Sequence, residues 1–170
     1  MVFLAGHGVN DRYGEYYFLP VDVEAERLRR SAVRFPEITD TAEKLAGKVV
    51  VFLDTCHSGN VWGGRGKRRA ADVLGLANEL ADAEHGVVSF MSTGSNQFAV
   101  EHSDWENGAF TEALVEGVGG AADAFGRGKI TVNSLGAYVA ERVKELTKGD
   151  QTPRLTIPDT IEDFPIAVKR

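Results

Sequence analysis

The chain contains a single cysteine, Cys56, and this residue has the side chain best suited to nucleophilic attack. It follows a run of apolar residues, in the sequence VVVFLDTCHSG at residues 49–59. The thiolate is the reactive form of cysteine, and an imidazole within reach can stabilise it and later protonate a leaving group. His7 offers such an imidazole, because it also follows an apolar run, in the sequence VFLAGHG at residues 2–8. Together these two residues have the chemistry for attack on a carbonyl carbon.

Two buried β-strands are predicted to carry these side chains. Residues 2–5 and 49–53 are short apolar runs, and each gives way to polar residues and glycine. Between them, Pro36 can begin a helix that ends before Gly47. A strand, a crossover helix and a second strand form a βαβ unit, whose strands are parallel. Ligands of open α/β sheets bind at the carboxyl ends of the strands, so the cysteine is placed to react.

The rest of the chain alternates between strand-like and helix-like segments. We expect strands at residues 16–19 and 87–91, a helix from near Leu74 to near Gly86, helices at residues 108–118 and 131–147, and a last edge strand from residues 155–157 and 165–168. Residues 22–35 are charged and have no clear assignment. The alternation predicts an α/β fold with a mostly parallel central sheet and helices on both of its faces.

Composition and charge restrict the class of protein. The 170 residues are 43% hydrophobic, which is enough for one domain with its own core. A formal net charge of -6 argues against nucleic acid or an anionic membrane as the main partner. No apolar run approaches the ~20 residues of a membrane-spanning helix. A single cysteine forms no internal disulfide, so we expect a cytoplasmic protein that is stabilised by packing.

Cys56 and His7 also allow interpretations other than nucleophilic chemistry. A lone cysteine is more often a small buried apolar residue, and a histidine between glycines is more often structural. A phosphatase loop needs an arginine six residues after its cysteine, and Trp62 stands there. A metal site of His7, Asp54 and His57 is disfavoured, because successive side chains of an extended segment diverge. We therefore expect neither a metal nor a cofactor.

Several motifs together resemble one known family, the caspase-like cysteine peptidases. FLAGHG at residues 3–8 and LDTCHSG at residues 53–59 are similar to the two catalytic motifs of this family, especially in its bacterial, metacaspase and paracaspase branches. The similarity continues through YYFLPVD at 16–22, NGAFTEAL at 107–114 and QTP at 151–153. A histidine about 50 residues before the nucleophile is typical of caspases. The resemblance covers nearly the whole chain and implies a caspase-like three-layer sandwich.

The resemblance implies a role for each residue of the two motifs. Cys56 is expected to be the nucleophile, His7 the base, and the backbone N–H groups of Gly8 and Cys56 the oxyanion donors. A glycine at position 8 suits this role, because no side chain hinders the approach of a substrate carbonyl. His57 is expected to be a supporting residue. The implied activity is that of a cysteine endopeptidase whose partners are protein or peptide substrates.

The resemblance also gives the organisation of the domain. One catalytic domain is expected to span residues 1–170, with a part like the large caspase subunit at about 1–60, a loop and helix at 61–86, and a part like the small subunit at 87–170.

Substrate preference is expected to depend on carboxylates near the nucleophile. Asp54 matches the acidic pocket position of the metacaspase and paracaspase branches, which cleave after arginine or lysine. Alignment of Ser92 with the small-subunit strand puts Glu101 near the position of an animal caspase's pocket arginine, and makes Ser92 a further substrate contact. Two carboxylates favour a cation, so we expect cleavage after Arg or Lys. In the alternative, Asp54 caps a turn and Glu101 is solvated.

A glycine-rich basic segment, GNVWGGRGKRR at residues 59–69, follows the nucleophile and is expected to be a surface loop. It lies where the two subunits of family members are commonly separated by processing. An enzyme that prefers basic residues would have this loop as its nearest substrate, present at high effective concentration. We therefore expect self-cleavage after one of four residues, Arg65, Lys67, Arg68 and Arg69. The alternative is a solvated loop with no such role.

The chain departs from the family pattern in several places. Family members carry further strands before the His-bearing strand, whereas this sequence begins almost on it. We therefore expect another polypeptide or a missing N-terminal segment to complete the sheet. Ala5 stands where a serine is often found, and only Asp22 matches the residues that bind calcium in some metacaspases. A catalytically silent interaction or regulatory module is the alternative to an active peptidase.

Overall fold

The computed structural model describes residues 1–11, 13, 15–57, 78, 80, 86–92 and 108–169, without the side chains of Cys56 and His57. Its strands are β1 (Val2–Asn10), β2 (Tyr16–Leu19), β3 (Val33–Arg34), β4 (Val49–His57), β5 (Val87–Met91), β6 (Lys129–Thr131), β7 (Arg154–Thr156) and β8 (Pro165–Val168). Its helices are α1 (Leu28–Ser31), α2 (Phe35–Glu43), α4 (Ala109–Glu116) and α5 (Val132–Leu146), with a 3-10 turn at Ala25–Arg27 and a π-helical turn at Gly117–Ala121.

The central sheet has six strands in the order β3-β2-β1-β4-β5-β7, and β6 and β8 form a separate two-stranded sheet. The middle of the central sheet is parallel, because β4 pairs with β1 on one side and with β5 on the other in the same direction. The flanking strands β2 and β7 are antiparallel to their neighbours. The predicted parallel pairing of the two motif-bearing strands is therefore confirmed.

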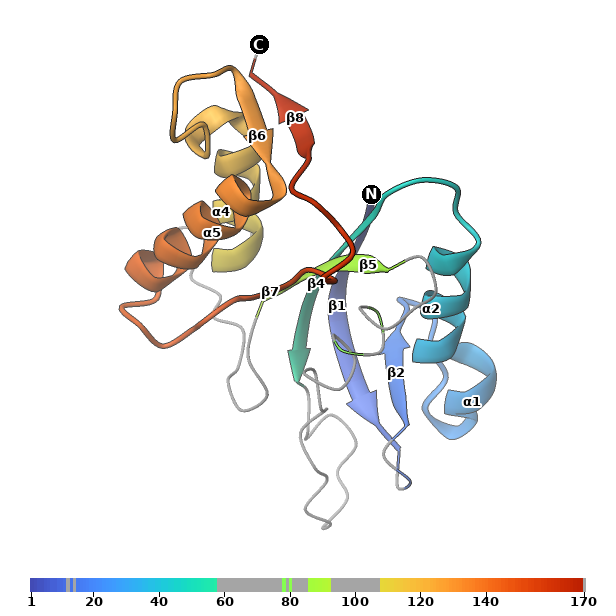
Figure 1. Cartoon of the computed structure of the whole chain (residues 1–170). Helices are drawn as coiled ribbons and strands as arrows, with labels where there is room; N and C mark the ends of the chain where they lie inside the picture. The colour runs from blue at the N-terminus through green and yellow to red at the C-terminus, as the bar shows by residue number, and fades with distance from the viewer. Residues whose placement is uncertain are drawn as a thin grey trace.

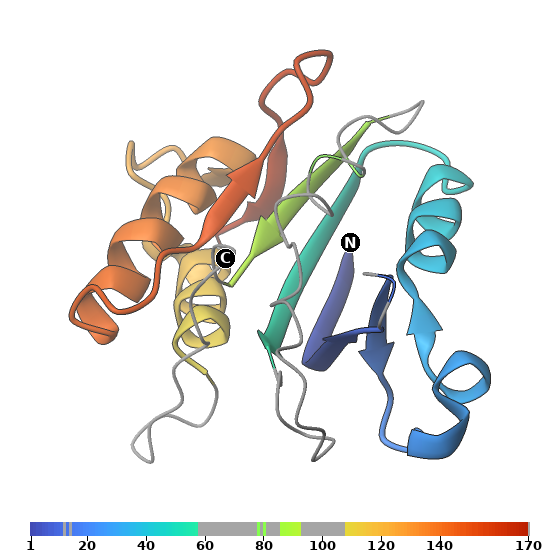
Figure 2. The same cartoon turned by 90° about the horizontal axis from the view of Figure 1, so that it is seen from below.

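Helices cover both faces of this sheet, as Figures 1 and 2 show. On one face Val51 and Leu53 of β4 pack in a core with residues of α2. On the other face Val50 and Phe52 pack in a second core with residues of α4 and α5. The apolar run of β4 is continuous because both of its faces are buried. The predicted α/β sandwich is confirmed.

Local sequence explains where the helices begin. Pro36 occupies the first turn of α2, where its missing N–H costs no hydrogen bond. Thr131 precedes α5 and forms a capping box with Ser134, in which each side chain bonds the other's backbone N–H.

Helices α4 and α5 are joined by an ion pair, because Arg142 Nε lies 2.7 Å from Glu116 Oε2. Within the described ranges, no helix has both the length and the apolar character needed to cross a bilayer.

Several elements differ from the sequence-based expectation. The strands predicted at residues 2–5 and 49–53 continue to Asn10 and His57, because β1 and β4 pair with each other up to Gly8 and His57 and the end of β1 also pairs with β2. Residues 154–156 form the expected edge strand, whereas residues 165–168 pair with β6 in the second sheet. The segment 22–35 contains a 3-10 turn, α1 and β3. The helix expected between Leu74 and Gly86 and the loop at 59–69 lie almost entirely outside the described residues.

The packing of β2 on β1 requires a glycine at position 8. The Tyr16 ring is 6% exposed and lies edge-on to Phe35, with ring centroids 6.1 Å apart. A Cβ atom added to Gly8 would overlap the Tyr16 ring and its hydroxyl oxygen. A buried ring with neighbours on both sides has little room to move, so a larger residue at position 8 has to displace β2.

We expect Gly8→Ala to lower the free energy of unfolding by about 1–3 kcal/mol, the usual cost of inserting a methyl group into a packed region. Gly119→Ala is the matched control, because a Cβ atom there has nothing within 4 Å. Urea denaturation of both variants and the parent chain measures the difference. Equal stability of all three proteins would contradict the packing argument.

Candidate active site

The carboxyl ends of β1 and β4 bring the two motifs side by side. His7 and Cys56 are direct partners in the parallel ladder, and Gly8 pairs with His57 in the same way. Adjacent strands lie about 4.8 Å apart, so the backbones at positions 7 and 56 are immediate neighbours. The side chain of Cys56 lies outside the described part of the chain, so its assignment as nucleophile stays a prediction.

His7 belongs to β1, which lies between β2 and β4 in the sheet, and its side chain is exposed. Its backbone pairs with Cys56 on β4 and with Leu19 on β2. Side chains of a strand alternate between faces, and the exposed residues Phe3 and Ala5 share the face of His7. The imidazole is therefore open to a ligand, as a catalytic base requires.

Tyr16 supports the other face of the same strand ends. Its hydroxyl forms a hydrogen bond with the side chain of Thr55, which immediately precedes Cys56. Burial raises the pKa of Tyr16 to about 12, although the bond with Thr55 opposes this rise. The phenol is therefore uncharged at neutral pH, and it connects β2 to β4 beneath Gly8. Tyr16 belongs to the motif YYFLPVD, but no local signal in the sequence predicts this contact with Thr55.

Asp54, the predicted pocket carboxylate, lies two residues before Cys56 on β4 and is half-buried. The Thr111 hydroxyl of α4 donates a hydrogen bond to Asp54 Oδ2 at 2.5 Å. This bond connects residues 57 positions apart in the sequence. Thr111 belongs to the motif NGAFTEAL, which gave no indication of its partner. The carboxylate is thus held on the sheet face that α4 covers.

Ser92, the second predicted substrate contact, lies directly after β5 and is 1% exposed. Its N–H donates to the Leu53 carbonyl at 2.9 Å, and its own carbonyl accepts from Gln151 Nε2 at 2.6 Å. Gln151 is itself fully buried. Ser92 therefore connects β4 to the segment that carries Gln151, while its contact with substrate stays a prediction. Gln151 is part of the motif QTP, whose role was not predicted.

Several predicted residues lie outside the described part of the chain. These are Glu101, the second pocket carboxylate, the side chain of His57, and the four processing residues Arg65, Lys67, Arg68 and Arg69. The structure thus describes one of the two predicted pocket carboxylates, Asp54. Among the described residues, no three His, Cys, Asp or Glu side chains form a group that could hold a metal ion.

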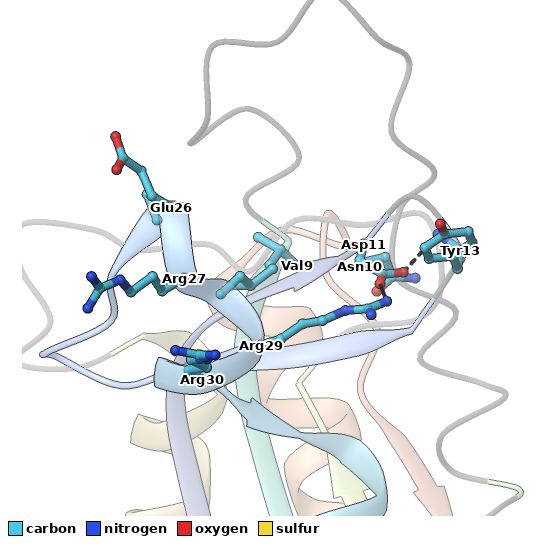
Figure 3. A pocket seen from close by; sticks show the side chains of 10 residues that line it. Val9, Asn10, Asp11, Tyr13, Glu26, Arg27, Arg29 and Arg30 are labelled. Carbon is cyan, nitrogen blue, oxygen red and sulfur yellow. Dashed lines mark hydrogen bonds and ion pairs between the residues drawn. The ribbon is translucent and has the colours of Figure 1, made fainter.

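A pocket of about 990 Å³ lies further along β1 from His7. Figure 3 shows that Arg29 extends across it toward Asp11, whereas Arg27 and Glu26 point away from that pair. Arg29 Nη2 lies 3.1 Å from Asp11 Oδ2, and its guanidinium lies 5.6 Å from the centre of the Tyr13 ring. No predicted motif contains these residues, which come from the connection between β1 and β2, from the 3-10 turn at Ala25–Arg27 and from α1.

Hydrogen bonds keep Asp11 ionised in this pocket. Its partial burial acts to raise its pKa, but bonds from the Tyr13 backbone and from Arg29 outweigh this effect and lower the pKa below its ordinary value. The same bond with Asp11 raises the pKa of Arg29. Both charges are therefore present at neutral pH, and their ion pair lies in the lining of the pocket.

Comparisons with known proteins identify the fold and the family of the chain. A crystal structure of a Geobacter sulfurreducens protein, a structural-genomics target, is similar to this chain with a TM-score of 0.61 and 20% sequence identity. The similarity covers 99% of this chain and 70% of the other, and at this identity it concerns the fold alone. A comparison with curated proteins gave no match. The family model of the caspase domain, Peptidase C14, matches residues 1–165. The chain therefore belongs to the caspase-domain family of peptidases.

Proposed function

We propose that this protein is a cysteine endopeptidase in which Cys56 is the nucleophile and His7 the general base and acid. The observation that carries the proposal is the pairing of His7 with Cys56 at the ends of adjacent parallel strands. Membership of the caspase-domain family supports the same assignment. A thiol and an imidazole on neighbouring strands need no further element to bring them together.

The proposed reaction has two halves. The Cys56 thiol gives its proton to His7, and the thiolate attacks the carbonyl carbon of the scissile peptide bond. When the tetrahedral intermediate collapses, His7 donates that proton to the leaving amine and an acyl-thioester remains on Cys56. His7 then takes a proton from water, whose oxygen attacks the thioester, and Cys56 leaves with the proton from His7. The substrate is thus split into an amine and a carboxylic acid.

The oxyanion of each intermediate is proposed to accept hydrogen bonds from the backbone N–H groups of Gly8 and Cys56. These residues lie on adjacent strands, one position apart in the ladder, because Cys56 pairs with His7 and Gly8 with His57. The Tyr16 packing and its bond with Thr55 support this arrangement by fixing both strand ends from below. Donors that are fixed before reaction stabilise developing charge without reorganisation.

The proposed substrates carry arginine or lysine before the scissile bond. Asp54 supports this specificity, because it is a half-buried carboxylate two residues before Cys56. Glu101 and Ser92 are proposed to complete the pocket. A carboxylate attracts a cation and repels a second carboxylate, so aspartate in the substrate is disfavoured. The same preference underlies the proposed self-cleavage at Arg65, Lys67, Arg68 or Arg69.

We also propose that a further strand, from a partner polypeptide or from a segment before residue 1, pairs with the first half of β1. Within the described residues, positions 2–6 pair with β4 alone, because pairing with β2 begins at His7. Phe3 in this segment is 47% exposed, and Met1, directly before it, is 75% exposed. Amide hydrogen exchange at residues 2–6 tests the idea, since a bound strand slows it. The alternative function is a catalytically silent interaction or regulatory module.

Replacement of Cys56 or His7 by alanine is expected to abolish peptidase activity without loss of the fold, because nucleophile and base act as one unit. Activity is measured with a peptide substrate, and the fold by circular dichroism. His85→Ala is a control, since no motif contains His85. Wild-type turnover by Cys56→Ala would contradict the assignment, and an inactive parent chain would favour the silent module.

A panel of fluorogenic peptides that differ only in the residue before the scissile bond tests the pocket. We expect arginine to be cleaved fastest, lysine more slowly because an ammonium lacks the planar fork of arginine, and aspartate not at all. Asp54→Asn should reduce cleavage after arginine at least about tenfold, as expected when a charged hydrogen-bond partner is lost. Preference for aspartate would show that the pocket model is wrong.

Incubation of the parent chain is expected to produce two fragments, cut after Arg65, Lys67, Arg68 or Arg69. Intact-mass spectrometry identifies the cut, and Cys56→Ala is the matched control because it retains the loop and lacks the nucleophile. Equal cutting of both proteins would indicate a contaminating protease. An uncut chain under conditions where peptides are hydrolysed would refute self-processing.

A further inference from the structure

We propose that Thr111 is the positioning residue that orients the Asp54 carboxylate toward a cationic substrate side chain. The contact that carries this inference is the hydrogen bond from Thr111 Oγ1 to Asp54 Oδ2, at 2.5 Å. The inference rests on the proposed function, because it takes Asp54 as the carboxylate that recognises arginine. It adds a residue from α4 that determines specificity through Asp54.

The position of Thr111 is fixed by the helix that carries it. Ala109, Phe110 and Ala113 of α4 are each 0% exposed and anchor the helix in the core on the face of β4 that bears Phe52. The side chain of Thr111 is β-branched, which limits rotation about its χ1 angle. Its hydroxyl is therefore presented to Asp54 from a helix that the core holds in place.

The use of this hydroxyl differs from the usual behaviour of a helical threonine. A threonine hydroxyl has one proton, and in a helix it commonly donates that proton to a carbonyl of the preceding turn. Thr41 in α2 does so, with its Oγ1 2.6 Å from the Glu37 carbonyl oxygen. Thr111 gives its proton to a side chain of another element. The two threonines can thus be compared directly, because the Thr41 hydroxyl bonds a carbonyl of its own helix and the Thr111 hydroxyl bonds the Asp54 carboxylate.

A fixed carboxylate should favour arginine over lysine. The bond to Oδ2 restrains rotation of the Asp54 carboxylate about its χ2 angle, so the plane of the group is set before the substrate arrives. A guanidinium forms two parallel bonds with a carboxylate and depends on this plane, whereas an ammonium acts as a point charge. Loss of the hydroxyl should therefore weaken binding of arginine more than that of lysine.

Binding to the Cys56→Ala protein tests the inference without the need for turnover. Two peptides that differ only in arginine or lysine before the scissile bond are titrated by calorimetry against this background and against the same protein with Thr111→Val. We expect Thr111→Val to weaken arginine binding about tenfold, a usual effect of losing a hydrogen bond to a charged group, and lysine binding by less. Thr111→Ser, which retains the hydroxyl, should stay within about twofold of the parent. Thr41→Val, the matched control, should change neither affinity.

A double-mutant cycle with Asp54→Asn separates this inference from the proposed function. If Thr111 acts through Asp54, Thr111→Val has no further effect in the Asp54→Asn background. Unchanged arginine affinity in Asp54→Asn alone would refute the proposed pocket. A loss in Asp54→Asn, with additive or absent effects of Thr111→Val, would refute the role of Thr111 and leave the pocket standing. If Thr111→Val fails to fold by circular dichroism, Thr111→Ala and Thr111→Ser give the same comparison.

Discussion

The parallel pairing of β1 with β4 is the interaction on which the rest of the structure depends. The ladder runs from the pair Val2 and Val51 to the pair Gly8 and His57 without a shift of register. Because its hydrogen bonds extend to the polar ends of both strands, His7 and Cys56 are held at the same level. A slip of one residue would turn every side chain of one strand to the opposite face and separate the two motifs. The pairing of these two strands therefore determines where His7 and Cys56 lie relative to each other.

Side chains from distant parts of the chain secure these strand ends. Tyr16 packs on Gly8 and bonds Thr55 on one face, and Thr111 holds Asp54 on the face covered by α4. A third contact of the same kind fixes the end of β5, through Gln151 and Ser92. Each contact joins a strand end to a segment that carries none of the proposed catalytic residues. The half of the chain after β5 thus has a direct part in shaping the site.

The sequence predicts most of the strands and helices, because apolar runs and periodic stripes are local signals, but it does not predict β3, β6 or α1. It predicts the neighbourhood of the two motifs, since a βαβ unit makes their strands parallel. It underestimates β1 and β4, whose polar ends look like loops and become strands through pairing with neighbouring strands, β4 with β1 and the end of β1 with both β4 and β2. The bonds of Thr111 and Gln151, the pairing of β6 with β8, and the pocket around Arg29 depend on contacts far apart in sequence, for which one sequence has no pattern.

The proposed dyad of Cys56 and His7 can be tested through the pH dependence of alkylation of Cys56 by iodoacetamide, compared between the parent chain and His7→Ala. The chain has one cysteine, so every modification reports on that thiol. If His7 stabilises the thiolate, the parent chain should react well below the pH of about 8.5 at which an ordinary thiol ionises, and His7→Ala should return to that value. Identical profiles for the two proteins would contradict the proposed dyad.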